Sequence, residues 1–370
     1  MANYNLIDYD NCITNLTSSI EKNFNLPPSY KTLKVADELL KEKDYKNVIV
    51  MIFDGMGSAI IQKNNAESNI LFKNKVADFK STYPPTTANC TTAYLSGKNP
   101  IETGWLGWSS HFESLNLSID NFTNELSDTK EKISGANIAN DLLGYEELGN
   151  KITKANPDVK YYKIGPRYFP YKYFSFRQLE SRLLKICNEP GKKYIYVYHD
   201  NPDHYMHEEG TQNLGVENIL KNISKFLTRF EKRCTDTIAF ISADHGQIDV
   251  NEIAFYTYYD LMSCLKAYPT CDSRTPFFFV KDDKKEQFKE LFNKYFSSYY
   301  DLLTKEQVKE MHIFGYGNPH PLFDSLLGDF IGIAKSNYYF SFAPNGHHFK
   351  GHHAGLLEDE ITIPLIVIKK

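Results

Sequence analysis

Acidic side chains that could bind a metal occur at three places in this sequence, and at two of them a histidine lies close by. Asp203 and His207 are four residues apart, a spacing that puts both on one face of a turn or helix start. Asp244 and His245 are adjacent, and Asp54 is followed by two glycines within three residues. Carboxylates and imidazoles in such pairs can share a metal ion. A polar turn or a helix N-cap would also explain each pair taken alone.

A fourth place is the tract 347–353 (HHFKGHH), which holds four of the eleven histidines. A His-rich surface loop with adventitious metal affinity explains most of these four. That interpretation need not cover all of them.

A hydroxyl group completes the set. Residues 83–93 (YPPTTANCTTA) pass from a Pro-fixed extended segment into a short helix that we expect to end near Gly97. A Thr at this junction is an N-cap in the simplest interpretation. The same geometry places a hydroxyl in the positive potential of a helix N-terminus, which favours an alkoxide or a bound phosphate.

Four apolar runs predict the strands that must position these groups. Residues 46–53, 193–199, 235–242 and 361–368 each read as a strand buried on both faces of a parallel sheet. Between the second and third runs, residues 216–230 carry apolar side chains at helical spacing, which predicts a strand–helix–strand crossover. We therefore expect an α/β fold, a doubly wound and mostly parallel sheet flanked by helices. The carboxyl ends of its strands would carry the active site.

The chain also has a stretch with elements of its own. Residues 247–345 separate the third strand from the last and contain a predicted strand at 276–281 and a helix at 285–296. This predicts a small α+β inserted subdomain at 247–345, within a core formed by 1–246 and 346–370.

Composition excludes several classes of protein. With 42% hydrophobic and 24% charged residues, the 370-residue chain is not a disordered one. A net charge of −4 argues against binding to duplex nucleic acid or an anionic membrane. The apolar runs are far shorter than the ~20 residues of a membrane helix, and the first residues do not read as a secretory signal. Six scattered cysteines without a CxxC pair indicate reduced thiols in a cytoplasmic protein.

Taken in order, these motifs resemble the alkaline phosphatase superfamily, and within it the type I phosphodiesterase/nucleotide pyrophosphatase branch. The resemblance runs from about Lys46 to Lys370. It rests on Asp54-Gly55, Thr87 in PPTTAN, Asn99-Pro100-x-x-x-Gly104 after Gly97, Asp203-x-x-x-His207, Asp244-His245-Gly246 and the late His353.

The resemblance implies a site and a mechanism. Two Zn²⁺, or other divalent metals, would be bound, one by Asp54, Thr87, Asp244 and His245, the other by Asp203, His207 and His353. Thr87 would be the nucleophile, and water would hydrolyse the resulting phospho-threonine. The substrate would be a small-molecule phosphate ester or a nucleotide, as for a phosphodiesterase or nucleotide pyrophosphatase.

One departure from the branch leaves alternatives open. Nucleotide pyrophosphatases carry an Asn that contacts the phosphate where this chain has Trp108, so we name Trp108 and Asn89 as candidate substrate-binding residues. A phosphomonoesterase or a phosphonate hydrolase on the same metals remains an alternative. A non-catalytic binding module predicts eroded ligand positions, and here every position is filled. The sequence leaves the oligomeric state open.

Overall fold

The first of two large sheets contains all four predicted strands. The computed structural model describes residues 6–64 and 69–370. The strand order is β2-β18-β9-β1-β8-β6-β7, with bounds β1 Asn47–Phe53, β2 Lys75–Lys80, β6 Lys160–Gly165, β7 Tyr171–Lys172, β8 Lys193–His199, β9 Thr237–Ser242 and β18 Thr362–Lys369. Strand β1 lies at the centre and every residue of it is buried, as in a sheet covered on both faces.

The direction of β18 differs from the prediction. Strands β8 and β9 pair with β1 in parallel, whereas β18 is antiparallel to both β9 and β2. The run 361–368 was expected to be parallel like the others, and that expectation is wrong. Strand β18 is antiparallel because the loop before it lies at the carboxyl edge of the parallel strands. The chain enters β18 from that edge and therefore runs opposite to its neighbours.

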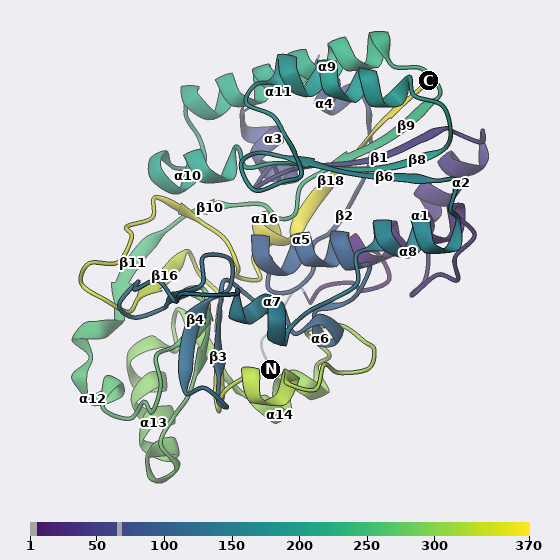
Figure 1. Cartoon of the computed structure of the whole chain (residues 1–370). Helices are drawn as coiled ribbons and strands as arrows, with labels where there is room; N and C mark the ends of the chain where they lie inside the picture. Colours follow the sequence, from purple (N-terminus) through teal and green to yellow (C-terminus); the bar gives the residue numbers. More distant parts are fainter. Residues whose placement is uncertain (1–5, 65–68) are drawn as a thin grey trace.

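Helices cover both faces of the first sheet (Figure 1). One layer contains α3 (Ser58–Asn64), α4 (Ile70–Lys73), α9 (Phe176–Cys187) and α11 (Leu214–Arg233). The other layer contains α1 (Ile13–Asn23), α2 (Lys34–Lys41), α5 (Thr87–Ser96) and α8 (Leu148–Ala155). The crossover helix predicted over 216–230 is α11, and the doubly wound, mostly parallel α/β fold is confirmed.

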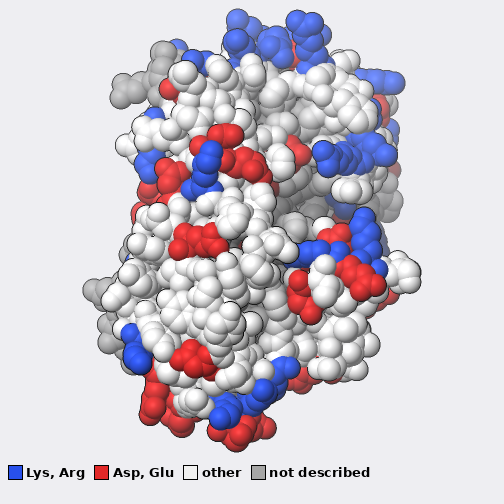
Figure 2. Space-filling model, turned by 90° about the vertical axis from the view of Figure 1, so that its left-hand side faces the viewer, with Lys and Arg blue, Asp and Glu red and all other residues white. Residues whose placement is uncertain are grey.

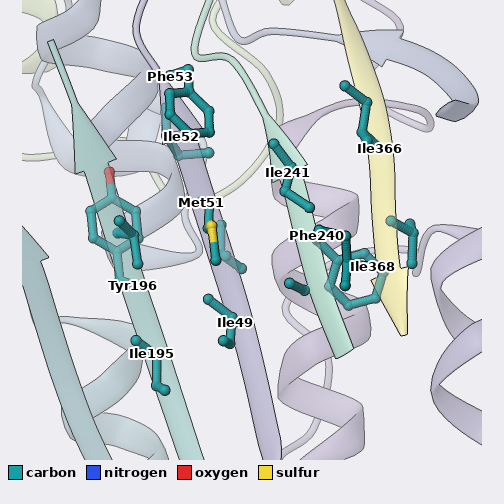
Figure 3. Packing of buried hydrophobic residues seen from close by; sticks show 14 of the residues in the cluster. Ile49, Met51, Ile52, Phe53, Ile195, Tyr196, Phe240, Ile241, Ile366 and Ile368 are labelled. Carbon is teal, nitrogen blue, oxygen red and sulfur yellow. The ribbon is translucent and has the colours of Figure 1, made fainter. Parts of the chain in front are cut away.

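Apolar side chains interleave between the strands and these helices. Figure 3 shows Ile195 of β8, Ile49 and Met51 of β1, Phe240 of β9 and Ile368 of β18 side by side. All five are buried. Burying such a side chain stabilises the folded state by roughly 1.5–3 kcal/mol, so the sheet holds the groups at its edge in fixed positions.

The second sheet has the order β14-β15-β13-β12-β3-β4-β5. Its bounds are β3 Ser109–Phe112, β4 Leu117–Asp120, β5 Glu125–Leu126, β12 Thr270–Asp272, β13 Thr275–Phe278, β14 Tyr300–Thr304 and β15 Phe330–Ala334. Residues 109–126 therefore join residues 270–334 in one sheet, through the pairing of Cys271 with Ser109. The division of the chain into a core of 1–246 with 346–370 and a subdomain of 247–345 stays a prediction. The second sheet contains strands from both of these parts.

Short helices surround the second sheet. They are α6 (Pro100–Thr103), α7 (Ile138–Leu142), α12 (Tyr259–Met262), α13 (Lys285–Phe296), α14 (Lys305–Glu310) and α15 (Phe323–Leu326), with 3₁₀ turns at Phe255–Thr257 and Asp282–Lys284. Helix α13 has the predicted bounds and buries Phe288, Phe292 and Phe296, which recur every four residues on one face.

Two short ladders hold the C-terminal loop. Strand β10 (Ile248–Asp249) pairs antiparallel with β17 (Gly351–His352), and β11 (Asn251–Ala254) pairs with β16 (Tyr338–Ser341). The register Ile248↔His352 brings the His-rich tract beside the segment that follows β9. Helix α16 (Glu358–Ile361) then leads into β18.

Acidic and basic side chains are intermixed on the face shown in Figure 2. Among residues 6–64 and 69–370, no helix is both long and apolar enough to cross a membrane.

Candidate metal centre

The ends of β1 and β9 bring two carboxylates together. The register pairs Ile52 with Ser242, so Asp54 and Asp244, each two residues further on, lie side by side just beyond the ends of neighbouring strands. Asp203 begins helix α10 (Asp203–Glu209), and its backbone N–H donates to the carbonyl oxygen of Asp54 at 2.9 Å. Gly55 permits this approach, because a Cβ there would lie 2.8 Å from the Cβ of Asp203. The predicted positions therefore converge at one edge of the sheet.

The first cluster surrounds the hydroxyl of Thr87. Its Oγ1 lies 3.4 Å from Oδ2 of Asp54 and 3.3 Å from Nε2 of His245. The same Nε2 lies 3.3 Å from Oδ1 of Asp54 and 3.6 Å from Oδ2 of Asp244. Thr87 is the first residue of α5, whose last residue is followed by Gly97 at a φ of 69°. The predicted helix junction and helix end are both present.

The second cluster adjoins the first. Oδ2 of Asp203 lies 3.1 Å from Nε2 of His207, one helical turn away on α10. Oδ1 of Asp203 lies 3.7 Å from Nε2 of His353. The rings of His353 and His245 stack with centroids 3.8 Å apart, which joins the two clusters.

Ligand-type atoms within 4.8 Å of one another form three overlapping triplets. They are Asp54/Asp244/His245, Asp203/His245/His353 and His207/His352/His353.

Backbone carbonyls orient the three imidazoles. Nδ1 of His207 lies 2.9 Å from the oxygen of Gly351, and Nδ1 of His245 lies 3.0 Å from that of Gly246. Nδ1 of His353 lies 3.0 Å from the oxygen of Pro85. Because a carbonyl only accepts, each Nδ1 carries a proton, and each Nε2 faces the carboxylates. This second contact is typical of metal-binding histidines.

The carboxylates are buried and incompletely hydrogen-bonded. In the described parts of the chain, Oδ1 of Asp54, Oδ1 of Asp203 and Oδ2 of Asp244 take part in no hydrogen bond. Burial and the neighbouring charges of Asp244 and Asp203 raise the pKa of Asp54 well above its usual value. Buried unpaired oxygens of this kind are costly, and a divalent cation would satisfy them. The donor set of carboxylate, imidazole and hydroxyl groups therefore fits zinc-like ions.

The remaining ionisations suit metal binding as well. Burial pushes the pKa of Asp203 upward, but the charge and hydrogen bond of His207, together with the charges of His245 and His204, outweigh burial and hold the pKa below its usual value. Burial and the neighbouring imidazoles of His245 and His352 hold the pKa of His353 well below its usual value. His353 is therefore neutral at neutral pH, the form in which imidazole binds metals.

The two predicted substrate-binding residues make other contacts. Asn89 is buried, and its side-chain amide donates to the carbonyl oxygen of Pro84 at 2.7 Å. Trp108 is 40% exposed and lies edge-on against Phe122, with centroids 5.9 Å apart. Their role as substrate-binding residues stays a prediction.

Sequence reasoning missed three residues beside the clusters. Tyr198 donates its hydroxyl to Oδ2 of Asp54. The only sequence signal for it is its place near the end of β8. Asp272 and His352 lie together, with His352 Nε2 3.3 Å from Asp272 Oδ1. The surface-loop interpretation holds for His347 and His348, whose side chains are 48% and 70% exposed, but His352 is buried like His353.

Comparison with known proteins agrees with this geometry. A cluster of carboxylates and imidazoles able to bind metal, at the carboxyl edge of a doubly wound sheet, is the arrangement expected of a metal-dependent hydrolase. The chain belongs to the type I phosphodiesterase/nucleotide pyrophosphatase family, whose model matches residues 48–356. This family consists of phosphoric ester hydrolases of the alkaline phosphatase superfamily, so the predicted resemblance and enzyme class are confirmed.

Solved structures share the fold at low sequence identity. Murine ectonucleotide pyrophosphatase/phosphodiesterase 5 is 14% identical with a TM-score of 0.64, and the match covers 86% of this chain and 87% of that one. An inactive threonine-to-alanine variant of the same mouse protein, in complex with AMP, is 16% identical with a TM-score of 0.62 and the same coverage. Phosphonoacetate hydrolase from Sinorhizobium meliloti, in complex with phosphonoformate, is 12% identical with a TM-score of 0.63, covering 88% and 90%. No curated protein matches the chain.

Proposed function

We propose that this chain is a two-zinc phosphodiesterase or nucleotide pyrophosphatase that acts through a phospho-threonine at Thr87. The observation that carries the proposal is the position of the Thr87 hydroxyl, 3.4 Å from Asp54 and 3.3 Å from His245 at the start of α5. A hydroxyl with no catalytic task would not need to face a buried carboxylate cluster.

Two metal positions follow from the clusters. Asp54, Thr87, Asp244 and His245 would hold one ion, and Asp203, His207 and His353 the other. Bound there, zinc or another divalent metal would lower the pKa of the Thr87 hydroxyl and stabilise charge on the phosphoryl oxygens. The pairwise contacts of Asp203 with His207 and His353 support the second position.

The side chains of the protein then perform the reaction. Oγ1 of Thr87, having released its proton to solvent, attacks phosphorus, and the bond to the leaving oxygen breaks with its electron pair on that oxygen, which takes up a proton from solvent where it leaves as an alcohol. The positive end of α5 faces the same phosphate and stabilises its charge. Water later attacks phosphorus from the side opposite Oγ1, and the P–Oγ1 bond breaks with its electron pair on Oγ1. Oγ1 takes up a proton released by the attacking water, which restores the hydroxyl of Thr87, and the phosphate product leaves. The imidazoles are already oriented by backbone carbonyls, so little reorganisation is needed.

Two structurally similar proteins give information on the substrate. The mouse neighbour was solved with AMP in a threonine-to-alanine variant described as inactive, which supports a nucleotide-type ester and a nucleophilic threonine. The bacterial neighbour was solved with phosphonoformate. A phosphonate hydrolase is therefore the second candidate, favoured further by Trp108 at the place of the family's phosphate-contacting Asn. A cytoplasmic location stays a prediction, supported by six cysteines that are all free and buried.

The test combines metal analysis with a substrate panel. The purified protein should hold about two zinc ions, lose activity in a chelator and recover it with Zn²⁺. It should hydrolyse a nitrophenyl nucleotide diester faster than a nitrophenyl monoester or phosphonoacetate. Faster cleavage of phosphonoacetate would favour the second candidate. A wild-type protein that binds no divalent metal would contradict the proposal.

The phospho-threonine has its own test. Zinc-loaded Thr87→Ala should lose nearly all turnover, and acid-quenched wild-type reactions should yield a peptide carrying phosphate on Thr87. Thr92→Ala, which removes another buried threonine of α5, is the matched control and should stay active. Full activity in zinc-loaded Thr87→Ala would show that water attacks directly.

A further inference from the structure

Strand β12 and the residues after it reach from the second sheet into the metal centre. Thr275 contacts two loops, since its hydroxyl donates to the carbonyl oxygen of Ala354 at 2.5 Å and lies 2.9 Å from the hydroxyl of Tyr83. One of these loops leads to Thr87 and the other carries His353. Ala354 has a φ of 83°, uncommon for a residue with a Cβ, so the second loop is held in a restrained conformation.

Asp272 makes the closest of these bridges. Its side chain is only 6% exposed, and Thr86 donates its hydroxyl to Oδ2 of Asp272 at 3.1 Å. Oδ1 of Asp272 lies 3.3 Å from Nε2 of His352, which is also 2.6 Å from the hydroxyl of Ser273. Asp272 therefore touches the residue before the nucleophile Thr87 and the residue before the ligand His353.

The contact with Thr86 replaces an ordinary local one. Thr86 is the N-cap residue of α5, where a threonine hydroxyl usually accepts from an N–H of the first turn. Here its side chain makes no such cap and is turned to Asp272 instead. The start of α5 is thus tied to the second sheet.

The charge of Asp272 also has no fixed cation beside it. Four buried carboxylates, those of Asp54, Asp203, Asp244 and Asp272, make ion pairs only with histidines among residues 6–64 and 69–370. Oδ1 of Asp272 makes no hydrogen bond within those residues. Four negative charges balance two divalent cations, and three of the four belong to the metal-binding residues.

We propose that Asp272 is a positioning residue that fixes the Thr87 loop and the His353 loop relative to each other, and that it thereby tightens zinc binding. The inference rests on the proposed function, because it assigns Asp272 a role toward the two metal positions. Asp272 acts through Thr86 and His352 and touches neither the metal nor the substrate.

The experiment measures zinc affinity in Asp272→Asn. This variant keeps the shape of the side chain and removes its charge. By competition with a chromophoric chelator, it should bind one of the two zinc ions about 10–100-fold more weakly, as is usual when a partner of a metal-binding residue is lost. Its kcat should fall at limiting Zn²⁺ and recover in excess Zn²⁺, with KM little changed.

Asp120→Asn is the matched control. Asp120 is a buried carboxylate of the same sheet that accepts from the hydroxyl of Ser127, and its ion pair is with Lys130. It should bind zinc like the wild type. Unfolding of all variants in excess chelator reports their folding separately from metal binding.

Thr86→Val tests the bridge itself and carries the test if Asp272→Asn does not fold. It removes the donor with little change of shape and should weaken zinc binding in the same direction. The double variant Asp272→Ala/Thr86→Val should lose no more than Asp272→Ala alone, because Asp272→Ala already removes the acceptor of the Thr86 hydroxyl. Additive losses, or wild-type zinc affinity and kcat in Asp272→Asn, would overturn the inference alone. Absence of zinc binding and hydrolysis in the wild type would overturn it together with the proposed function.

Discussion

Removing the carboxylate of Asp54 should stabilise the metal-free protein. Burial and the charges of Asp244 and Asp203 raise the pKa of Asp54 well above its usual value. A carboxyl with a raised pKa in the folded state holds its proton more tightly there than in the unfolded chain. Stability therefore falls as pH rises from the unfolded pKa of about 3.9 to the raised folded pKa. Asp54→Asn abolishes this loss while keeping an oxygen for the hydroxyl of Tyr198.

The geometry sets the size of the effect. Ligand atoms of Asp54 and Asp244 lie within 4.8 Å of each other. Two like charges at that distance repel by about 3.5 kcal/mol at an effective dielectric constant of about 20. Asp54 could avoid this repulsion by taking up a proton, which at pH 7 costs about 4 kcal/mol relative to an unfolded pKa of about 3.9. The destabilisation caused by the Asp54 carboxylate therefore cannot exceed about 4 kcal/mol. With an unfolding entropy of about 2.1 cal/mol/K per residue, a penalty of about 3.5 kcal/mol in this 370-residue chain corresponds to a melting shift of about 4–5 °C.

The assay is calorimetric unfolding in excess chelator as a function of pH, repeated with Zn²⁺. At pH 7–8, metal-free Asp54→Asn should melt about 4–5 °C above the wild type, and the difference should vanish near pH 4. Zinc should stabilise the wild type far more than the variant. Metal-free Asp54→Asn melting below the wild type at pH 7–8 would refute the reasoning.

Asp203→Asn is the control of opposite sign. The charge of His207 holds the pKa of Asp203 below its usual value despite burial, so its carboxylate contributes stability that is lost as pH falls through that lowered pKa. Removing it should therefore lower the melting temperature of the metal-free protein at neutral pH. The two carboxylates lie in one site, but their pKa values shift in opposite directions because Asp54 lies beside other carboxylates and Asp203 lies beside histidines.

Three further outcomes are expected. Thr87→Ser should keep substantial activity on a nitrophenyl nucleotide diester, since it offers the same oxygen, and activity as low as that of Thr87→Ala would contradict this. His353→Ala should lose zinc in a metal assay, whereas exposed His204→Ala should not, and equal loss in both would count against the ligand set. Arg274→Met should lower the free energy of unfolding by about 3–5 kcal/mol in denaturant titration, because it leaves the buried Glu360 without its partner, and a change below about 1 kcal/mol would contradict this.

The sequence was sufficient to predict the edge of the first sheet. Continuous apolar runs mark β1, β8 and β9, and in parallel strands the residues after each run must share one edge. That argument alone places Asp54, Asp203 and Asp244 together. An apolar run has no direction, however, and the reversal of β18 follows from where the preceding loop lies, which no local pattern encodes.

The second sheet was harder to foresee for a different reason. Strands β3, β4 and β5 are four, four and two residues long, too short to show an alternating pattern. Asp272 was missed because its partner Thr86 is 186 positions away. The sequence TCDSRT around Asp272 reads as an ordinary turn, and only the pairing of β12 with β3 and β13 brings it to the metal centre.

The two sheets therefore hold different parts of the centre. Asp54 and Asp244 follow rigid strands whose register fixes their separation, so sheet packing determines their geometry. Thr87 begins α5 directly after a loop, and His353 lies in the loop after β17; such loops by themselves could take several conformations. The contacts from residues 272–275 select one of them, through Thr86, His352 and Ala354. Changes in the second sheet should consequently alter metal binding and turnover before they alter the stability of the first sheet.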